Sequence, residues 1–268
     1  MASFSIVSNI ASVNAQANLG ATQIGLNKAI TRLSSGFRIN FSGDDAAGLA
    51  VANKYRSNVA ILNQGVRNAN DGLSVLQIKD GALNNISTLI DRLATLASQA
   101  SSPSNGVDIG KLEDEYNSVL EEIDREAAVA SLDADTDFSV FISNEASTAD
   151  GVVTGTITAA DSDTLGLTAA SWTDASDAQA SLTELSSAVD TLGDVQNTVG
   201  TLENRLAFAI SLATAQIVNT KAAESRIRDA NIAEESANLT RYNILSQSGI
   251  AALAQANNLA GSVLSLLR

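Results

Sequence analysis

The chain has 268 residues and no histidine or cysteine, which excludes HExxH zinc sites, Ser-His and Cys-His nucleophile pairs, thiolate metal sites and disulfides. It is 45% hydrophobic but only 4% aromatic and has one proline, a composition that favours long helices packed through alanine and branched aliphatic side chains. The net charge of −14 is uneven, with +4 in residues 1–79, −20 in 80–203 and +2 in 204–268, and this acidic centre argues against a nucleic-acid partner.

A helix is predicted near the N-terminus, where apolar or small side chains recur at steps of three and four residues. We call this set the N-terminal stripe; it comprises Ile6, Ile10, Val13, Ala17, Gly20 and Ile24. The leader lacks a basic n-region and a continuous apolar run, so we expect no cleaved secretory signal. The helical register should break at residues 34–36, which read Ser-Ser-Gly.

Asp44 and Asp45 are placed to start the next helix, because carboxylates accept hydrogen bonds from the free N–H groups there. Paired acids also suit a metal ion, but no further ligands lie close by in the sequence. From Val59 a long heptad pattern predicts a bundle helix that ends near Pro103. Its heptad positions are Leu62, Ala69, Leu76, Leu83, Ile90 and Ala97.

A shorter acidic helix is expected around Tyr116. Its carboxylates could suggest general acid/base chemistry, but no nucleophile or oxyanion-hole motif accompanies them, so we expect no enzyme activity, no metal and no cofactor. Residues 131–173 lose helical periodicity, and two alternating segments predict a small β-hairpin there. We expect Trp172 to be a packing anchor under this flap, and the flap to hold few apolar residues and to be dispensable for the helical core.

Helix returns near Asp177, with Leu185, Leu192, Val199 and Leu206 at heptad spacing. The last helix carries a second set at steps of three and four, which we call the C-terminal stripe. It comprises Tyr242, Leu245, Gly249, Ala252, Ala256, Leu259, Val263 and Leu266. The two stripes predict that the ends of the chain zip together and lie between several helices. Polar residues such as Gln247 and Asn257 argue against a membrane span.

Both ends of the chain resemble bacterial flagellin. The matching segments read LSSGFRIN from Leu33, DDAAGLA from Asp44, RNANDG from Arg67 and ILSQSGIAALAQANNLAGSVLSLLR at the C-terminus. The resemblance covers roughly residues 1–130 and 180–268, so the chain resembles a short flagellin with a reduced central variable region.

The fold that follows is mainly α, an elongated antiparallel helical bundle and coiled coil formed by the N- and C-terminal segments, with a small β-hairpin region in the middle. The expected terminal coiled-coil domain combines residues 1–43 and 225–268. The helical bundle domain combines residues 44–130 and 177–224, and residues 131–176 form the variable hairpin region. The resemblance implies that the terminal domain lines the lumen of a filament and the bundle forms its shell.

The implied function is a structural subunit that polymerises into the bacterial flagellar filament for motility. The residues expected to carry self-association are Ile6, Ile10, Val13, Ala17, Ile24, Leu245, Ala252, Leu259, Val263 and Leu266. The resemblance further implies an extracellular location, type III export without a cleaved signal peptide, and an export chaperone, filament cap and hook-junction proteins as partners. It also implies that Arg92 is a contact for the innate immune receptor, weakened because Thr95 stands where a Glu would be.

Three alternatives remain open at this point. A hook–filament junction protein of the same axial structure shares related terminal helices. An enzyme carried on a flagellin scaffold and a secreted adhesin or membrane-active helical protein belong to other classes. Filaments formed by the purified protein would favour the filament subunit.

Overall fold

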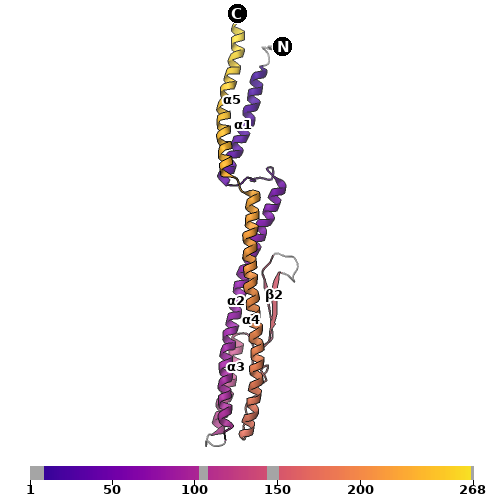
Figure 1. The fold of residues 1–268 in the computed structure, drawn as a ribbon, viewed down its shortest axis with the longest axis vertical. Coiled ribbons are helices and arrows are strands. Elements are labelled where there is room, and N and C mark those ends of the chain that lie inside the picture. Colours follow the sequence, from indigo (N-terminus) through magenta and orange to yellow (C-terminus); the bar gives the residue numbers. More distant parts are fainter. Residues whose placement is uncertain (1–8, 103–107, 144–150, 267–268) are drawn as a thin grey trace. The chain divides into compact units, whose positions relative to one another are not determined.

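A computed structural model of the chain describes residues 9–102, 108–143 and 151–266, with side chains described up to residue 258 in the last helix. The described residues form five helices and one two-stranded sheet, which confirms the mainly α prediction (Figure 1). The elements are α1 (Ile10–Ser35), α2 (Ala46–Ala100), α3 (Ile109–Val129), β1 (Thr136–Phe141), β2 (Val152–Ile157), α4 (Ala175–Arg228) and α5 (Ile232–Leu266).

The ends of α1 and the start of α2 follow from local side-chain chemistry. The Asn9 side chain accepts a hydrogen bond from the Ser12 N–H, which caps the start of α1. At the other end Gly36 has a φ of 75°, a left-handed conformation that glycine adopts without strain, so the predicted break is confirmed. The Asp45 carboxylate accepts the Gly48 N–H at 2.8 Å and caps α2, as predicted. Asp44 does not cap the helix and has a different role, described below.

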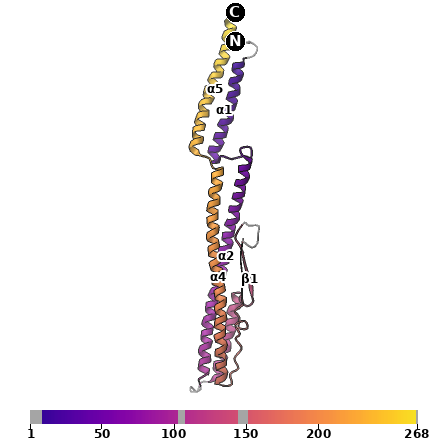
Figure 2. The same ribbon diagram turned by 45° about the vertical axis from the view of Figure 1, so that its right-hand side comes forward.

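The contacts divide the chain into two compact units. The terminal unit combines Met1–Ser57 with Thr220–Arg268, and the central unit is Asn58–Asn219. The domain limits expected from the sequence fall at other residues, and they stay predictions. In both views α1 lies beside α5, and α2 lies beside α4 (Figures 1 and 2).

The core of the central unit is formed by the predicted heptad positions. Each of the six heptad residues of α2 from Leu62 to Ala97 is buried, and Leu76 and Leu83 have no exposed surface. The four heptad residues of α4 from Leu185 to Leu206 are buried in the same core cluster. The heptad pattern therefore predicted correctly which faces of the two long helices meet.

The β-hairpin is confirmed, and it packs on α2 and α4. β1 pairs antiparallel with β2, with Thr136 opposite Ile157 and Phe141 opposite Val152. A Cβ at Gly65 of α2 would collide with the backbone carbonyl of Ile142, so only glycine lets the chain that continues β1 lie this close to the helix.

Side chains of both long helices also hold the outer edges of the hairpin. Asn68 of α2 donates to the Phe141 carbonyl at 3.2 Å. Arg205 of α4 donates to the Thr154 carbonyl at 2.8 Å. The hairpin is therefore fixed to the bundle through its backbone as well as through apolar contacts.

The segment after the hairpin is part of the core as well. Trp172 is 6% exposed and its ring meets the buried Tyr116 ring edge to face, with centroids 5.0 Å apart, which confirms the predicted packing anchor. Burial raises the pKa of Tyr116 to about 12. Asn117 of α3 donates to the carbonyl of Ala170 and accepts its N–H, as a neighbouring strand would.

The expectation that residues 131–173 hold few apolar residues is wrong. Buried apolar side chains of this region that belong to the central core are Leu132, Val140, Ile142, Ile157, Ala160, Leu165, Leu167, Ala170 and Trp172. The two alternating segments and the packing role of Trp172 were predicted, whereas Leu132, Leu165 and Leu167 lie outside the alternating segments and were missed. The tertiary structure gathers them against α2, α3 and α4.

Candidate self-association surface

The terminal unit is built on an antiparallel pair, α1 against α5. Contacts between the helices recur with opposite chain directions: the Asn9 side chain donates to the Ala256 carbonyl at 2.8 Å, and Arg32 pairs with Glu235 at 3.0 Å. The chain therefore folds back on itself, as the two stripes predicted.

Two glycines allow the helices of this pair to approach closely. A Cβ at Gly25 of α1 would lie 2.6 Å from ring atoms of Tyr242. A Cβ at Gly249 of α5 would lie 3.2 Å from the Leu19 side chain. A larger residue at Gly25 would have to displace an aromatic ring, so the pair depends on this small residue.

The N-terminal stripe does not form the contact with α5. Ile10, Val13 and Ile24 are 61%, 62% and 71% exposed, and Ala17 is exposed as well. The residues of α1 that are buried or half-buried are Ser12, Ala15, Leu19, Thr22, Gly25, Leu26, Ala29, Thr31, Arg32 and Leu33. Val13, Ala17 and Ile24 each lie two positions from one of these residues, about 200° around the helix. The prediction that the N-terminal stripe zips against the other end is therefore wrong for the single chain.

The C-terminal stripe is divided between two faces. Tyr242, Gly249 and Ala256 lie against α1, as predicted, whereas Leu245 is 46% exposed and Ala252 is exposed. Ser246 and Leu253 are half-buried instead. The remaining predicted residues lie outside the description: Ile6 precedes the described residues, and the side chains of Leu259, Val263 and Leu266 are not described.

The sequence contained a signal for the residues that were missed. Leu19 and Leu26 are seven apart and belong to a second set at steps of three and four along the same helix. A helix with two such sets presents two contact faces, and the sequence alone does not say which face meets its own chain.

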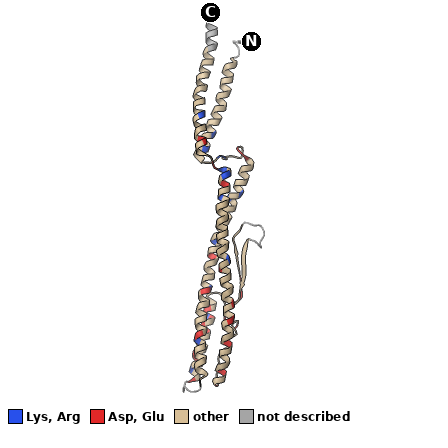
Figure 3. Cartoon of the chain, in the orientation of Figure 1, with Lys and Arg blue, Asp and Glu red and all other residues tan. Residues whose placement is uncertain are grey.

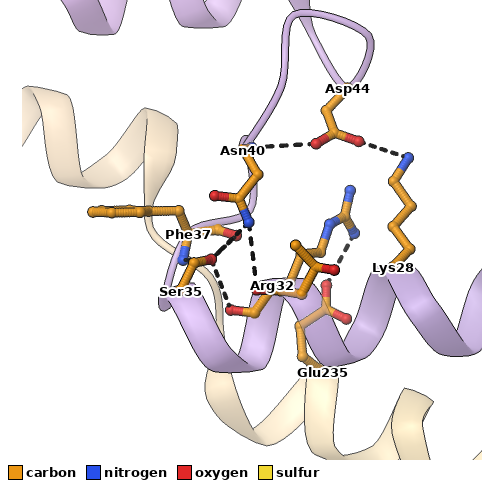
Figure 4. A network of polar contacts seen from close by, with 8 residues as sticks. Lys28, Arg32, Ser35, Phe37, Asn40, Asp44 and Glu235 are labelled. Carbon is orange, nitrogen blue, oxygen red and sulfur yellow. Dashed lines mark hydrogen bonds and ion pairs between the residues drawn. The ribbon is translucent and has the colours of Figure 1, made fainter.

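A polar network fixes the turn between α1 and α2 (Figure 4). The Lys28 ammonium contacts the Asp44 carboxylate at 2.8 Å, and the backbone N–H of Asn40 also donates to Asp44. These interactions, led by the one with Lys28, hold the pKa of Asp44 below its usual range. The Asn40 side chain donates to the Ser35 hydroxyl at 2.7 Å. The turn that follows α1 is therefore tied back onto the helix.

The same turn contacts the chain between α4 and α5. The Arg38 N–H donates to the Arg228 carbonyl at 2.6 Å, and the Ala230 N–H donates to the Gly36 carbonyl at 2.9 Å. The Arg228 guanidinium lies 4.1 Å from the centre of the Phe37 ring, a cation–π contact. The motif LSSGFRIN thus supplies both the end of α1 and the contacts that join the two connecting segments.

Arg92, the candidate receptor contact, lies in the central unit. Its side chain is about half-exposed, at 51%, and forms an ion pair with Glu115 of α3. Thr95 donates its hydroxyl proton to the Arg92 carbonyl, as helical threonines often do. The position is therefore accessible, but its charge is shared with a carboxylate of the same chain.

These features define a class: a helical structural protein whose ends pair with each other and leave rows of apolar side chains exposed. Within the described residues no helix combines the length and hydropathy needed to cross a membrane.

Comparisons with known proteins agree with this class. The family model described as the bacterial flagellin N-terminal helical region matches residues 6–139, and that of the C-terminal helical region matches residues 182–267. Flagellin of Halalkalibacterium halodurans is 35% identical, with 97% of this chain and 98% of the relative covered. Flagellin of Bacillus subtilis strain 168 is 31% identical at the same coverage of both chains. A crystal structure of Bacillus cereus flagellin is 30% identical and covers 59% of this chain and 94% of its own, with a TM-score of 0.47.

The chain belongs to the bacterial flagellin family. It is a structural subunit of the flagellar filament and not an enzyme, and the comparisons do not favour the hook–filament junction alternative.

Proposed function

We propose that the exposed apolar residues of the terminal unit are the contacts through which this filament subunit polymerises. The observation that carries the proposal is the exposure of the N-terminal stripe on the side of α1 away from α5. Apolar side chains in a continuous row are rarely left in water by a protein that works as a monomer. A second copy of the chain supplies a matching apolar surface in the exposed residues Ile244, Leu245 and Ile250 of α5.

Such a contact is heterologous, because α1 of one subunit meets α5 of another. When the rotation that relates neighbouring subunits does not return to the first subunit, heterologous contacts generate an open helical polymer and not a closed ring. One chain thus offers both halves of the contact, which repeats along the filament. The proposed residues are Ile6, Ile10, Val13, Ala17 and Ile24 on the N-terminal side, and Leu245, Ala252, Leu259, Val263 and Leu266 on the C-terminal side.

Electron microscopy and sedimentation of the full chain test this proposal, with Ile24→Asp as the variant. Ile24 is 71% exposed, so the new carboxylate stays in water in the monomer and the melting temperature should hardly change. In a filament the carboxylate would be buried without a partner, which is costly, so polymerisation should stop. Asn18→Asp is the matched control, since it adds the same charge to α1 at an exposed residue outside the stripe. Normal filaments from Ile24→Asp protein would contradict the proposal.

We also propose export without a cleaved signal peptide, with an export chaperone, a filament cap and hook-junction proteins as further partners. Membership of the flagellin family supports this proposal. Intact-mass measurement of the secreted protein checks the export route: the expected N-terminus is Met1 or Ala2, and a shortened chain would contradict it.

For Arg92 we propose a weak contact with the innate immune receptor. The support is its exposure, together with Thr95 at the position of the expected carboxylate. Thr95→Glu should increase receptor stimulation by the monomer. Equal stimulation by both proteins would refute the role given to Thr95.

A further inference from the structure

The charge of the chain is segregated between the two units. The terminal unit contains ten Lys/Arg and six Asp/Glu, a net +4, whereas the central unit contains six Lys/Arg and 24 Asp/Glu, a net −18. Figure 3 shows basic residues gathered near the end of α4, and acidic residues along the helices of the central unit. Subunits of this composition repel each other when their central units meet and attract each other when unlike units meet.

Three of the six acidic residues of the terminal unit form ion pairs within the chain. Asp44 pairs with Lys28, Glu235 with Arg32, and Glu224 is 3.9 Å from Arg228. A group of exposed basic residues near the end of α4 is left without a carboxylate at ion-pair distance among the described residues. We call this group the basic patch; it comprises Lys221 and Arg226 of α4 and Arg38, whose guanidinium donates to the Ile227 carbonyl at 3.0 Å.

The outer face of α3 carries the opposite charge. Asp114 and Glu121 are exposed and seven residues apart, so they share one side of the helix. That side is opposite the buried face formed by Tyr116, Ile123 and Ala127. Neither acid has an ion-pair partner among the described residues, whereas Glu115 and Glu122 are paired with arginines.

We propose that the outer face of α3 in one subunit docks on the basic patch of a second copy of this chain. This inference rests on the proposed polymerisation and adds a second, polar contact to the apolar one. It is again heterologous, because a central unit meets a terminal unit, so it is compatible with an open helix. Complementary charge also steers the encounter and favours the register in which the acidic face meets the basic patch.

Charge reversal with rescue tests the docking. The first variant, Asp114→Lys/Glu121→Lys, reverses the acidic face, and the second, Lys221→Glu/Arg226→Glu, reverses part of the basic patch. Reversal turns attractive contacts at the surface into repulsive ones, so each double variant should raise the critical concentration for polymerisation about tenfold at low salt. The chain that carries all four substitutions should polymerise better than either parent variant. Its recovery should fade as added salt screens the charges.

Asp190→Lys/Asp194→Lys is the charge-matched control, since it changes the same net charge at two exposed residues of α4 in the same unit. It should polymerise at least as well as the unchanged protein, because it only reduces repulsion. An equal loss in this control, or no recovery in the fourfold variant, would overturn the docking while filaments of the unchanged chain still supported the proposed function. If the unchanged chain formed no filaments, the proposed function would fail and the docking with it. Circular dichroism of each monomer identifies any variant that fails to fold.

Discussion

The terminal and central units carry apolar residues at similar helical spacings, yet they bury them to very different extents. In the central unit Leu76 and Leu83 have no exposed surface, whereas Ile10 and Ile24 of the terminal unit are 61% and 71% exposed. The central unit surrounds α2 with α3, α4 and the hairpin, which together cover its apolar positions. In the terminal unit α1 pairs along its length with α5, and one partner helix covers one face.

One kind of sequence pattern therefore has two outcomes. Where enough elements of the same chain surround a helix, the pattern forms a core. Where they do not, the apolar side chains stay exposed, as Ile10 and Ile24 do. The difference lies in the number of neighbours and not in the apolar residues themselves.

Leu83→Asp should have the largest effect, because it places a charge among the buried residues that distinguish the central unit from the terminal one. The carboxylate would be buried without a partner in the central core, at an expected cost of at least about 4 kcal/mol, which is comparable with the whole stability of many domains. Ile78→Asp is the matched control on the same helix, because Ile78 is 64% exposed. Calorimetry should show loss of the cooperative transition for the first variant and a nearly unchanged one for the second. Cooperative melting of Leu83→Asp protein at the original temperature would refute the assignment of the core.

Gly65→Ala should have the next largest effect, because the added methyl meets the Ile142 backbone, which cannot turn aside as a side chain can. Such overpacking costs roughly 1 to 3 kcal/mol. Gly81→Ala, also within α2, has nothing within 4 Å of the new methyl and should stabilise the helix by about 0.5 to 1 kcal/mol. Thermal melts of the two variants should therefore shift in opposite directions. A stabilised Gly65→Ala protein would mean that the hairpin is not seated on α2.

In the terminal unit, Gly25→Ala and Gly20→Ala likewise compare a crowded glycine of α1 with an uncrowded one. The methyl at Gly25 meets the Tyr242 ring, which can partly move, so a destabilisation of about 1 kcal/mol is expected. At Gly20 nothing lies within 4 Å, and α1 should gain about 0.5 to 1 kcal/mol from the better helix former. Hydrogen exchange of α1 amides measures both changes. Faster exchange in the Gly20 variant than in the Gly25 variant would contradict the observed pairing.

The smallest effect is expected from pH at Asp44. Because its pKa is lowered in the folded chain, Asp44 binds fewer protons there than in the unfolded chain. Its contribution is complete above the usual carboxyl pKa and is lost as the pH falls through the lowered value. Asp44→Asn should abolish this pH-dependent loss of stability. The loss amounts to about 1 kcal/mol or less, as expected for an ion pair at the surface. Melting temperatures at pH 3 and pH 6 measure this loss, with Asp71→Asn at an exposed residue as the control. If the melting temperatures of both variants changed equally with pH, the stabilising role of ionised Asp44 would be excluded.

The local sequence predicted the elements that depend on neighbours along the chain. The heptads of α2 and α4, the break at Gly36 and the Asp45 cap were confirmed, because periodicity, left-handed glycine and capping carboxylates act over one or two turns. The hairpin was also predicted, since alternation of side chains is a local property of a strand.

The candidate site was predicted less well. Tyr242, Gly249 and Ala256 meet α1 as expected, but Leu253 replaces Leu245 and Ala252 on the contact face, and the whole described N-terminal stripe faces away from α5. The spacing of apolar residues in a stripe predicts that a helix has an apolar face. It contains no information on which of several apolar faces meets which partner.

Local patterns in the sequence were enough to locate the helices and strands, to identify the buried faces of the central helices, and to place the chain among the flagellins. The tertiary structure decided which face of α1 meets α5, because small residues such as Gly25 and Gly249 set the distance of closest approach at particular levels of the pair. It also decided that the segment around Trp172 belongs to the core, since its scattered apolar residues meet only when α3 and α4 bring them together. Spacing along a chain is a one-dimensional property, whereas burial depends on how many neighbours the folded chain places around each side chain.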